Sequence, residues 1–410
     1  MLKKHDAFLQ VTDLLSSILG KLNQLSKPRK KFLLMFFQVW FSVRGRFNFI
    51  NIGRYCESSE QTFRNQFKTA FDWFSINLKL VNEIKTGPLI AVFDPSYISK
   101  SGKLTPNLGY FWSGVAQSAL KGLEIGCLAL VDLTAETAFH LSASQTPNPK
   151  MLKTQGKTLI DHYLESILAV GSELVKVVEY LVVDGYFAKK EFINSIRIKL
   201  GLHVITKLRR DANLRYLFSG TQKTCRGRKR EFAGKVNLKK IDRRIFKNAG
   251  VIENKTEVWS ALLHWAPLNQ TVRIVYLFHK PTGNYEVLMS TDTNQEPLEI
   301  LKFYRLRFQI EFLLRDAKQH SGLEHCQSRN EIALHNHFNA SLTAVSLAKA
   351  VTIMEEIKPS QAVFSMGDLK TWFANRLLTL RIFSNLDLDL SLKKNKRILE
   401  DSLNFGRMAA

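Results

Sequence analysis

Apolar side chains recur at the spacing of an α-helix through the first part of the chain. Hydrophobic residues repeat every three or four positions over residues 8–19 and again over residues 32–43, which predicts helices with one buried face. Ser58 followed three residues later by Gln61 fits a capping box. This pattern predicts a further helix over residues 61–80.

The pattern changes after Gly87 and Pro88, a pair that breaks helices. Short apolar runs bounded by turn residues now predict strands, and amphipathic segments predict helices between them. The predicted strands cover residues 89–93, 123–131, 138–144, 180–183 and 203–206, and the predicted helices cover residues 158–170 and 189–200. Three strands, a helix, a strand, a helix and a strand form the order of a ribonuclease H-like core, a mixed α/β fold.

The rest of the chain predicts an interruption of this core and a return to helix. Residues 211–291 form a basic, loop-rich and mostly β insertion, with strands predicted near 251–263, 271–279 and 285–289. Residues from 297 onward are again helical. The predicted division is a helical DNA-binding domain (1–86), the first part of the core (87–210), the insertion (211–291), the second part of the core (292–358) and a C-terminal helical tail (359–410).

A helix-turn-helix is one interpretation of the N-terminal region. Two short helices joined by a polar turn would place Arg64, Asn65 and Lys68 near the exposed face of the second helix, where they could read DNA. A plain helical bundle with a solvated basic face explains the same pattern. The motif carries too little sequence information to separate the two interpretations.

The chain carries a large surplus of positive charge. There are 59 Lys and Arg against 36 Asp and Glu, a formal net charge of +23. Residues 207–247 alone hold 15 basic and 3 acidic side chains, which is about half of the surplus. This concentration favours a polyanionic partner, nucleic acid first, over a basic protein that has no specific partner.

The densest basic cluster lies in the predicted insertion. It comprises Arg226, Arg228, Lys229 and Arg230, preceded by Lys223 and followed by Lys239, Lys240, Arg243 and Arg244. Such runs bind the phosphate backbone without reading the base sequence. A solvated loop is the alternative interpretation.

Several classes of protein are disfavoured by the composition. The longest apolar run, residues 32–41, is about half the length that spans a bilayer, and the N-terminus does not resemble a secretory signal, so no membrane partner is expected. The four cysteines form no CxxC pair, which favours a reducing, cytoplasmic setting and no zinc site. A phosphate-binding GxxxxGK[ST] loop is missing, so no nucleotide cofactor is expected.

Two aspartates follow apolar strands directly. Asp94 comes after the strand predicted at residues 89–93, and Asp184 comes after the strand at 180–183. A carboxylate at the end of a strand is rigidly held and still reachable, which suits hard divalent cations. Either residue alone is more often a turn former, but neighbouring strands would place the two together.

A third acid lies on a predicted helix over residues 303–318. Tyr304, Arg307, Glu311 and Lys318 are spaced by three, four and seven residues, so they fall within roughly 60° on one helical face. An exposed face with an Arg307–Glu311 ion pair is the simpler explanation. A phosphodiester site explains the row better, because Glu311 would complete a metal site while Arg307 and Lys318 hold phosphate oxygens.

These residues resemble a known family. Tyr304, Arg307, Glu311 and Lys318 match the Y-R-E-K signature of transposases of the insertion-sequence 4 family, which are DDE transposases related to the transposon 5 transposase. Asp184, followed by Gly185-Tyr186-Phe187, is similar to that family's second-aspartate motif. The sequence around Asp94, with Ser96 and Lys100 after it, is compatible with the first. The resemblance covers residues 89 to about 324.

The resemblance implies a function and a set of roles. Asp94, Asp184 and Glu311 would be catalytic and would bind two Mg²⁺ ions, for which Mn²⁺ could substitute, while Tyr304, Arg307 and Lys318 bind phosphates. The enzyme would be a cut-and-paste transposase that acts as a homodimer on double-stranded DNA in the bacterial cytoplasm, associated with the nucleoid.

In this family a flipped base commonly stacks on a tryptophan of the insertion. Trp259 and Trp265 are the candidates, although both residues are more often found in a core. Two other functions share the same residues. One is a ribonuclease H-like nuclease that does not transfer strands, and the other is a DNA-binding protein derived from a transposase.

Overall fold

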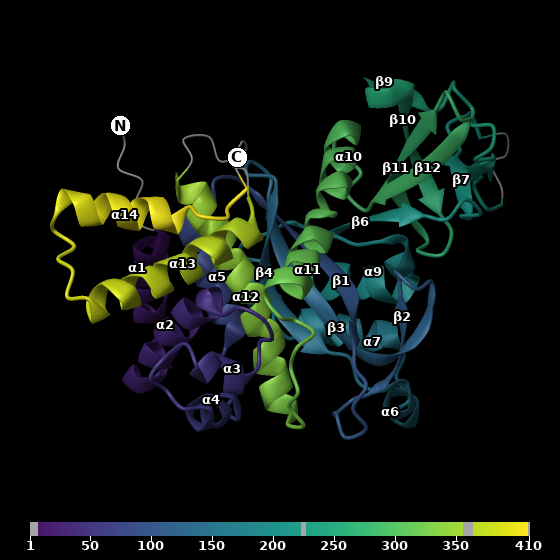
Figure 1. The fold of residues 1–410 in the computed structure, drawn as a ribbon. Helices are drawn as coiled ribbons and strands as arrows, with labels where there is room; N and C mark the ends of the chain where they lie inside the picture. The colour runs from purple at the N-terminus through teal and green to yellow at the C-terminus, as the bar shows by residue number, and fades with distance from the viewer. Residues whose placement is uncertain (1–6, 223–226, 356–363, 409–410) are drawn as a thin grey trace. The chain divides into compact units, whose positions relative to one another are not determined.

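The computed structural model describes residues 7–222, 227–355 and 364–408 (Figure 1). The contacts between residues divide the chain into two compact units. Unit 1 comprises Met1–Pro88, Pro95–Gln155 and Gln309–Ala410, and unit 2 comprises Leu89–Asp94 and Gly156–Phe308. The division into five segments stays a prediction. None of the helices in the described part of the chain is long and apolar enough to cross a membrane.

Five helices begin unit 1, and the hydrophobic pattern predicts the first two of them. They are α1 (Ala7–Gly20), α2 (Lys27–Ser42), α3 (Phe49–Gly53), α4 (Glu60–Phe67) and α5 (Trp73–Ile84). Their apolar faces meet in an aromatic cluster, in which the ring of Phe36 lies 4.8 Å from Trp40 and 5.1 Å from Phe67. Because these helices share a unit with later segments, a separate DNA-binding domain stays a proposal.

The start of helix α4 differs from the predicted capping pattern. Ser59, not Ser58, is the N-cap, and its hydroxyl accepts the backbone N–H of Thr62. The single helix predicted over residues 61–80 is also wrong. It is divided in two because Asp72 caps a new helix by accepting the N–H of Ser75 at 3.0 Å.

Unit 1 also contains a small antiparallel sheet. Its strands are β2 (Gly109–Ser113), β3 (Ser118–Asp132) and β4 (Thr137–Gln145), with β3 paired to both others. Its remaining helices are α6 (Pro149–Thr154), α11 (Gln309–His320), α12 (Glu331–Glu355), α13 (Met366–Asn385) and α14 (Lys393–Leu403). Helices α5, α11 and α12 pack on β4. The strands predicted from residues 123–131 and 138–144 are confirmed.

Helix α12 is the buried centre of unit 1, and it carries polar side chains into the core. Asn336 accepts the indole N–H of Trp73 at 2.9 Å, and Asn339 accepts the backbone N–H of Ala143 at 2.9 Å. A buried amide without a partner costs about 1–3 kcal/mol. These bonds therefore fix the rotation of α12 about its axis, which apolar packing alone specifies less sharply.

Unit 2 is built on a mixed sheet. Its strands are the first six residues of β1 (Leu89–Ser99), then β5 (Tyr180–Val182), β6 (His203–Leu208), β7 (Leu214–Leu217), β8 (Phe232–Lys235), β9 (Lys247–Ile252), β10 (Thr256–Trp265), β11 (Gln270–His279) and β12 (Asn284–Ser290). The order is β1–β5–β6–β12–β11–β10–β7–β8, with β9 also on β10. Strands β1, β5 and β6 are parallel, and the following pairs are antiparallel.

The insertion is mostly β, as predicted, and it extends the core sheet. Val287 of β12 pairs with Leu208 of β6, so the hydrogen-bonded ladder runs on without interruption. The helices of unit 2 are α7 (Leu159–Leu168), α8 (Gly171–Leu174), α9 (Lys190–Leu200) and α10 (Pro297–Leu306). Helix α10 packs on β6 and on strands β10 to β12.

The helix predicted over residues 303–318 is broken. Helix α10 ends at Leu306 and α11 begins at Gln309. The backbone N–H of Arg307 bonds to the carbonyls of Phe303 and Tyr304, and that of Phe308 bonds to Arg305. The bonds to Tyr304 and Arg305, each three residues back, tighten the last turn and end the regular ladder. The four signature residues are therefore divided between two helices, with Tyr304 on α10, Arg307 as its C-cap, and Glu311 and Lys318 on α11.

Candidate active site

Asp94 lies inside a strand and not at its end. The sequence predicted that β1 stops at Asp94, but the strand continues to Ser99. The five preceding residues, Leu89–Phe93, are buried, while Asp94 is half-buried. The apolar run thus marks only the part of the strand that lies in the core.

Asp184 lies at a strand end, as predicted. It follows β5 and caps the one-turn helix η1 (Gly185–Phe187), accepting the backbone N–H of Tyr186 at 2.9 Å. The hydroxyl of Thr206 on β6 donates to the carbonyl of Asp184 at 2.7 Å. Both bonds fix the backbone that carries the carboxylate.

The register of the parallel strands brings the two aspartates to one level. Ala91 pairs with Leu181, and Val92 pairs with Val182. Extended by two residues, this register places Asp94 level with Asp184. Neighbouring strands lie about 4.8 Å apart, so this register brings the backbone of Asp94 beside that of Asp184, just past the end of β5.

A buried arginine accompanies this pair. Arg307 is 6% exposed, and its Nη1 lies 3.6 Å from Oδ1 of Asp94. Burial raises the pKa of Asp184, while the charge of Arg307 acts in the opposite direction. The charged form of a carboxylate in such surroundings is stabilised by a nearby cation, because the cation offsets the loss of hydration.

Tyr304 is the second signature residue in unit 2. It is 8% exposed, and burial raises its pKa to about 12. Its phenol therefore keeps its proton at neutral pH and can donate a hydrogen bond. The ring lies 5.7 Å from the guanidinium carbon of Arg307.

The other two signature residues belong to unit 1. Glu311 is half-buried in the first turn of α11, and Lys318 on the same helix donates from Nζ to the carbonyl of Tyr97 at 2.7 Å. Unit 2 thus brings Asp94 and Asp184 together with Tyr304 and Arg307. Because Glu311 lies in the other unit, the meeting of three carboxylates stays a prediction.

The donor set suits a hard divalent cation, although the described residues do not form a complete cage. Aspartate oxygens on rigid strands are the ligands that Mg²⁺ and Mn²⁺ prefer. Within the described ranges, no group of three or more His, Cys, Asp or Glu side chains is placed to hold a metal ion. The aspartate pair alone leaves coordination positions for water or phosphate oxygens.

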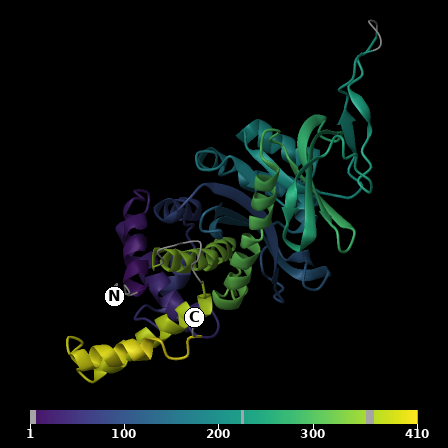
Figure 2. The same cartoon turned by 90° about the horizontal axis from the view of Figure 1, so that it is seen from above.

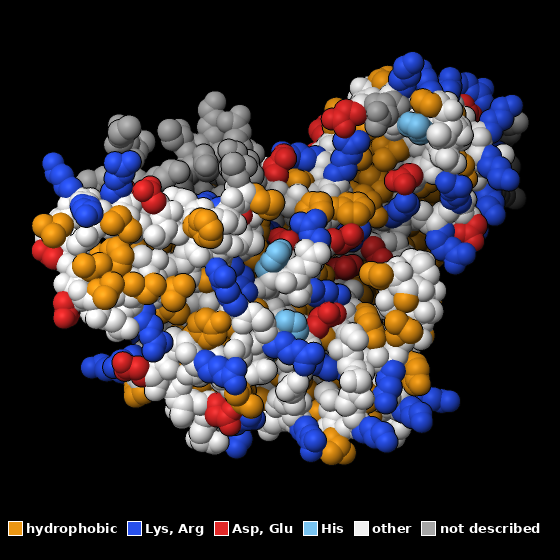
Figure 3. Space-filling view, viewed as in Figure 1, with side chains coloured by type: hydrophobic (Ala, Val, Ile, Leu, Met, Phe, Trp, Pro, Cys, Tyr) orange, Lys and Arg blue, Asp and Glu red, His pale blue; other side chains and the backbone are white. Residues whose placement is uncertain are grey.

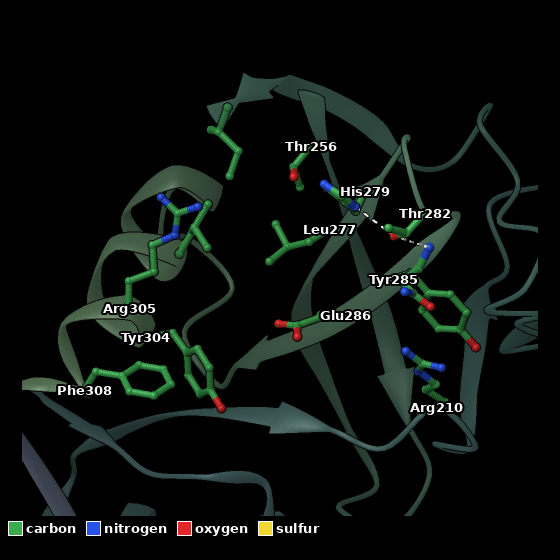
Figure 4. A pocket seen from close by; sticks show the side chains of 13 residues that line it. Arg210, Thr256, Leu277, His279, Thr282, Tyr285, Glu286, Tyr304, Arg305 and Phe308 are labelled. Atoms are coloured by element: carbon green, nitrogen blue, oxygen red, sulfur yellow. Dashed lines mark hydrogen bonds between the residues drawn. The ribbon is translucent and has the colours of Figure 1, made fainter. Parts of the chain in front are cut away.

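A pocket of about 500 Å³ lies in unit 2 beside Tyr304 (Figure 4). Tyr304 and Phe308 approach it from one side, and Tyr285 and Arg210 from the other, with Glu286 between them (Figure 4). Phe308 is 48% exposed. Phe308 and Tyr285 were not predicted from the sequence as site residues, although Phe308 directly follows a signature residue. A volume of this size is ordinary for a small-molecule site.

The two tryptophans of the insertion differ in accessibility. Trp265 is 3% exposed and belongs to the core, so its predicted stacking on a base is not compatible with this structure. Trp259 is half-buried. Its indole N–H donates to Glu257 at 3.1 Å, and Arg243 lies over its ring at 5.0 Å. A role for Trp259 in stacking stays a prediction.

Three residues of the basic cluster, Arg228, Lys229 and Arg230, lie on a projecting ribbon, the β7–β8 arm, defined as residues 214–222 and 227–235. Figure 2 shows the arm extending away from the other strands of unit 2. Arg228, Lys229 and Arg230 are exposed, while Arg226 lies outside the described residues. Gln222 and Arg230 exchange two hydrogen bonds across the arm. In Figure 3, Lys and Arg side chains gather over this part of unit 2.

The predicted DNA-reading residues are exposed on a short helix. Arg64 and Asn65 lie on α4, and Lys68 is its C-cap. Arg64 lies 3.6 Å from Glu60. Helix α4 has two turns and α3 only about one, so the helix-turn-helix interpretation stays a prediction.

Comparison with known families agrees with this arrangement. Residues 150–347 match the family model described as the transposase DDE domain. The match supports a DDE transposase. The matched residues, nearly half of the chain, include Asp184 and Glu311 and begin after Asp94. No curated protein matches the sequence.

The DDE domain indicates an enzyme that acts on DNA, and DDE transposases generally use divalent metal ions. The mixed α/β architecture, with its large sheet in unit 2, is consistent with a ribonuclease H-like DDE domain. This agrees with the fold class predicted from the order of strands and helices.

Proposed function

We propose that the protein is a cut-and-paste transposase of the insertion-sequence 4 type. It would bind the inverted repeats at the ends of an element, cleave them and join the 3′-hydroxyl ends to target DNA. The observation that supports this proposal best is the aspartate pair, Asp94 level with Asp184 on adjacent parallel strands. The match of residues 150–347 to the transposase DDE domain supports it independently.

Asp94, Asp184 and Glu311 are the proposed metal ligands, with two Mg²⁺ ions per site and Mn²⁺ as a substitute. Such ions would activate a water or a 3′-hydroxyl and stabilise the leaving oxygen. Arg307 would offset the negative charge of the aspartates when no metal ion is bound. Tyr304, kept protonated by its high pKa, would donate to a phosphate oxygen, and Lys318 would add a positive charge.

Double-stranded DNA is the proposed partner, bound through phosphate contacts of the β7–β8 arm and read by α4. Arg228, Lys229 and Arg230 are exposed on the arm, as phosphate contacts require. We also propose a homodimer, since both ends of an element must be held in one complex when they are joined to the target.

A strand-transfer assay tests the function. Pre-cleaved element ends that carry a free 3′-hydroxyl would be incubated with a target plasmid and Mg²⁺. Joined products are expected, and their loss in the Asp94→Asn variant would assign them to this site. Nicking without joining would instead identify a ribonuclease H-like nuclease, and inert protein with both Mg²⁺ and Mn²⁺ would identify a DNA-binding relative.

The pocket beside Tyr304 is the proposed site for a flipped base. Phe308 is exposed, and Tyr285 is backed by Tyr276 in a stacked pair at 5.2 Å. An unstacked base between such rings gains about 1–3 kcal/mol from each contact. This assignment moves the base away from Trp265, which is buried.

A Phe308→Ala variant is expected to lower the cleavage of paired ends by about tenfold, since it removes one stacking surface. An element end with 2-aminopurine at the flipped position would report the change, because this base fluoresces more when unstacked. Leu298→Ala on helix α10 is the control, because Leu298 is exposed to the same degree as Phe308. Equal fluorescence and cleavage in both variants would contradict the assignment.

A further inference from the structure

The β2–β3 hairpin of unit 1 carries exposed aromatic side chains that the proposed function does not use. Tyr110 is 68% exposed and Trp112 is 60% exposed, whereas Phe111 between them is 3% exposed. Alternate residues of a strand share a face, so the two exposed rings lie on one side, about 7 Å apart along β2. Tyr110 pairs with Lys121 and Trp112 pairs with Ala119 across the hairpin.

The segment that carries these rings has a net positive charge. Residues 95–123 contain three lysines and no Asp or Glu. Lys121 is exposed and stands on the same face as Tyr110, because cross-strand partners point to the same side. In the preceding loop, Asn107 donates a hydrogen bond to Glu331. Aromatic rings beside ammonium groups complement a polyanion that carries flat bases.

The hairpin is anchored and does not depend on a ligand for its shape. The hydroxyl of Tyr97 donates to the carbonyl of Lys121 at 2.7 Å, and Gln145 donates to the carbonyl of Pro106 at 2.9 Å. Val115, at the tip, is fully exposed. Rings presented by a fixed backbone lose less conformational freedom on binding than rings on a loose loop.

We propose that this face binds unpaired nucleotides of DNA, with bases stacked on Tyr110 and Trp112 and the phosphate backbone near Lys121. Stacking on aromatic side chains tolerates any base, because every base has a π-face. The site is therefore expected to prefer single-stranded over duplex DNA and to lack sequence preference. It rests on DNA as the substrate of the proposed function, but on none of the catalytic residues.

Affinity for a single strand measures the contribution of the rings. A Tyr110→Ala/Trp112→Ala variant of the full chain is expected to bind a short fluorescent oligo-dT at least about tenfold more weakly, given the usual effect of removing stacked rings. Trp112→Phe should retain most of the affinity. The matched control is Phe405→Ala, since Phe405 is 81% exposed in the same unit.

Photochemical cross-linking locates the contact. An oligonucleotide that contains 5-iododeoxyuridine should attach to the tryptic peptide of residues 104–121, which holds both rings. Unchanged affinity in the double variant, with cross-links only elsewhere, would overturn the proposal. So would a changed oligomeric state at unchanged affinity, which would identify a protein interface.

The two proposals can fail separately. Cross-linking and affinity require no cleavage, so an Asp184→Asn variant should keep both. A chain that cleaves and joins DNA normally in the double variant, without loss of single-strand affinity, would refute the hairpin site alone. A wild-type chain that cross-links at residues 104–121 but never cleaves would refute the transposase proposal alone.

Discussion

An Asp184→Asn variant is expected to cleave element ends at least about 10³-fold more slowly than the wild type. The loss corresponds to roughly 4 kcal/mol of transition-state stabilisation, within the range that metal ligation supplies. Asparagine keeps an oxygen that can accept the N–H of Tyr186, so the local fold should persist. Single-turnover cleavage with Mg²⁺ measures the rate, and calorimetry with Mn²⁺ measures the binding of the metal.

The matched control is Asp211→Asn, an exposed aspartate of unit 2 that lies 3.3 Å from Arg209. It removes the same charge and should leave cleavage unchanged. Glu311→Gln, compared with Glu299→Gln on α10, tests the third carboxylate in the same way. DNA binding should stay within a few fold in all four variants. Near-normal cleavage by Asp184→Asn would remove the central assignment.

Replacing Arg228, Lys229 and Arg230 together with Ala is expected to weaken DNA binding for every duplex sequence. Each phosphate contact contributes about −0.9 to the slope of log K against log salt. Loss of three contacts should therefore make the slope shallower by about 2.7. Over a fourfold rise in salt concentration, the affinity of the variant should then fall about 40-fold less than that of the wild type. Fluorescence anisotropy across a salt series, with cognate and random duplexes, measures both effects.

The control replaces Lys393, Lys394 and Lys396 of α14 with Ala. These lysines are exposed, and their replacement removes the same charge. A slope that falls equally in both variants would show only the effect of net charge. A loss confined to cognate ends would show that the arm reads bases, contrary to the phosphate-contact proposal.

The element types followed from the sequence because they depend on local pattern. A short apolar run such as Leu89–Phe93, bounded by turn residues, is typical of a buried strand. The helical period of the apolar residues in α7 and α9 is typical of helices that pack through one face. Strand β2 was missed because its alternating aromatics, Tyr110 and Trp112, face outward. Their exposure depends on which strand becomes its neighbour, and the sequence does not state this.

The end of a helix is harder to predict than its interior. Residues 303–318 have a continuous helical period, yet the chain breaks after Leu306. The side chain of Arg307 lies near Asp94, about two hundred residues earlier. A contact so distant in sequence cannot be read from the local period.

By itself, the sequence determined the α/β class, the two aspartates on buried strands and the basic stretch around Arg228, since each follows from local spacing or composition. Only the tertiary structure decided the register that brings Asp94 level with Asp184, the burial of Arg307 beside Asp94 and the burial of Trp265. Pairing register and burial are properties of neighbours brought together by folding. A strand shifted by one residue would turn the same side chains to the opposite face.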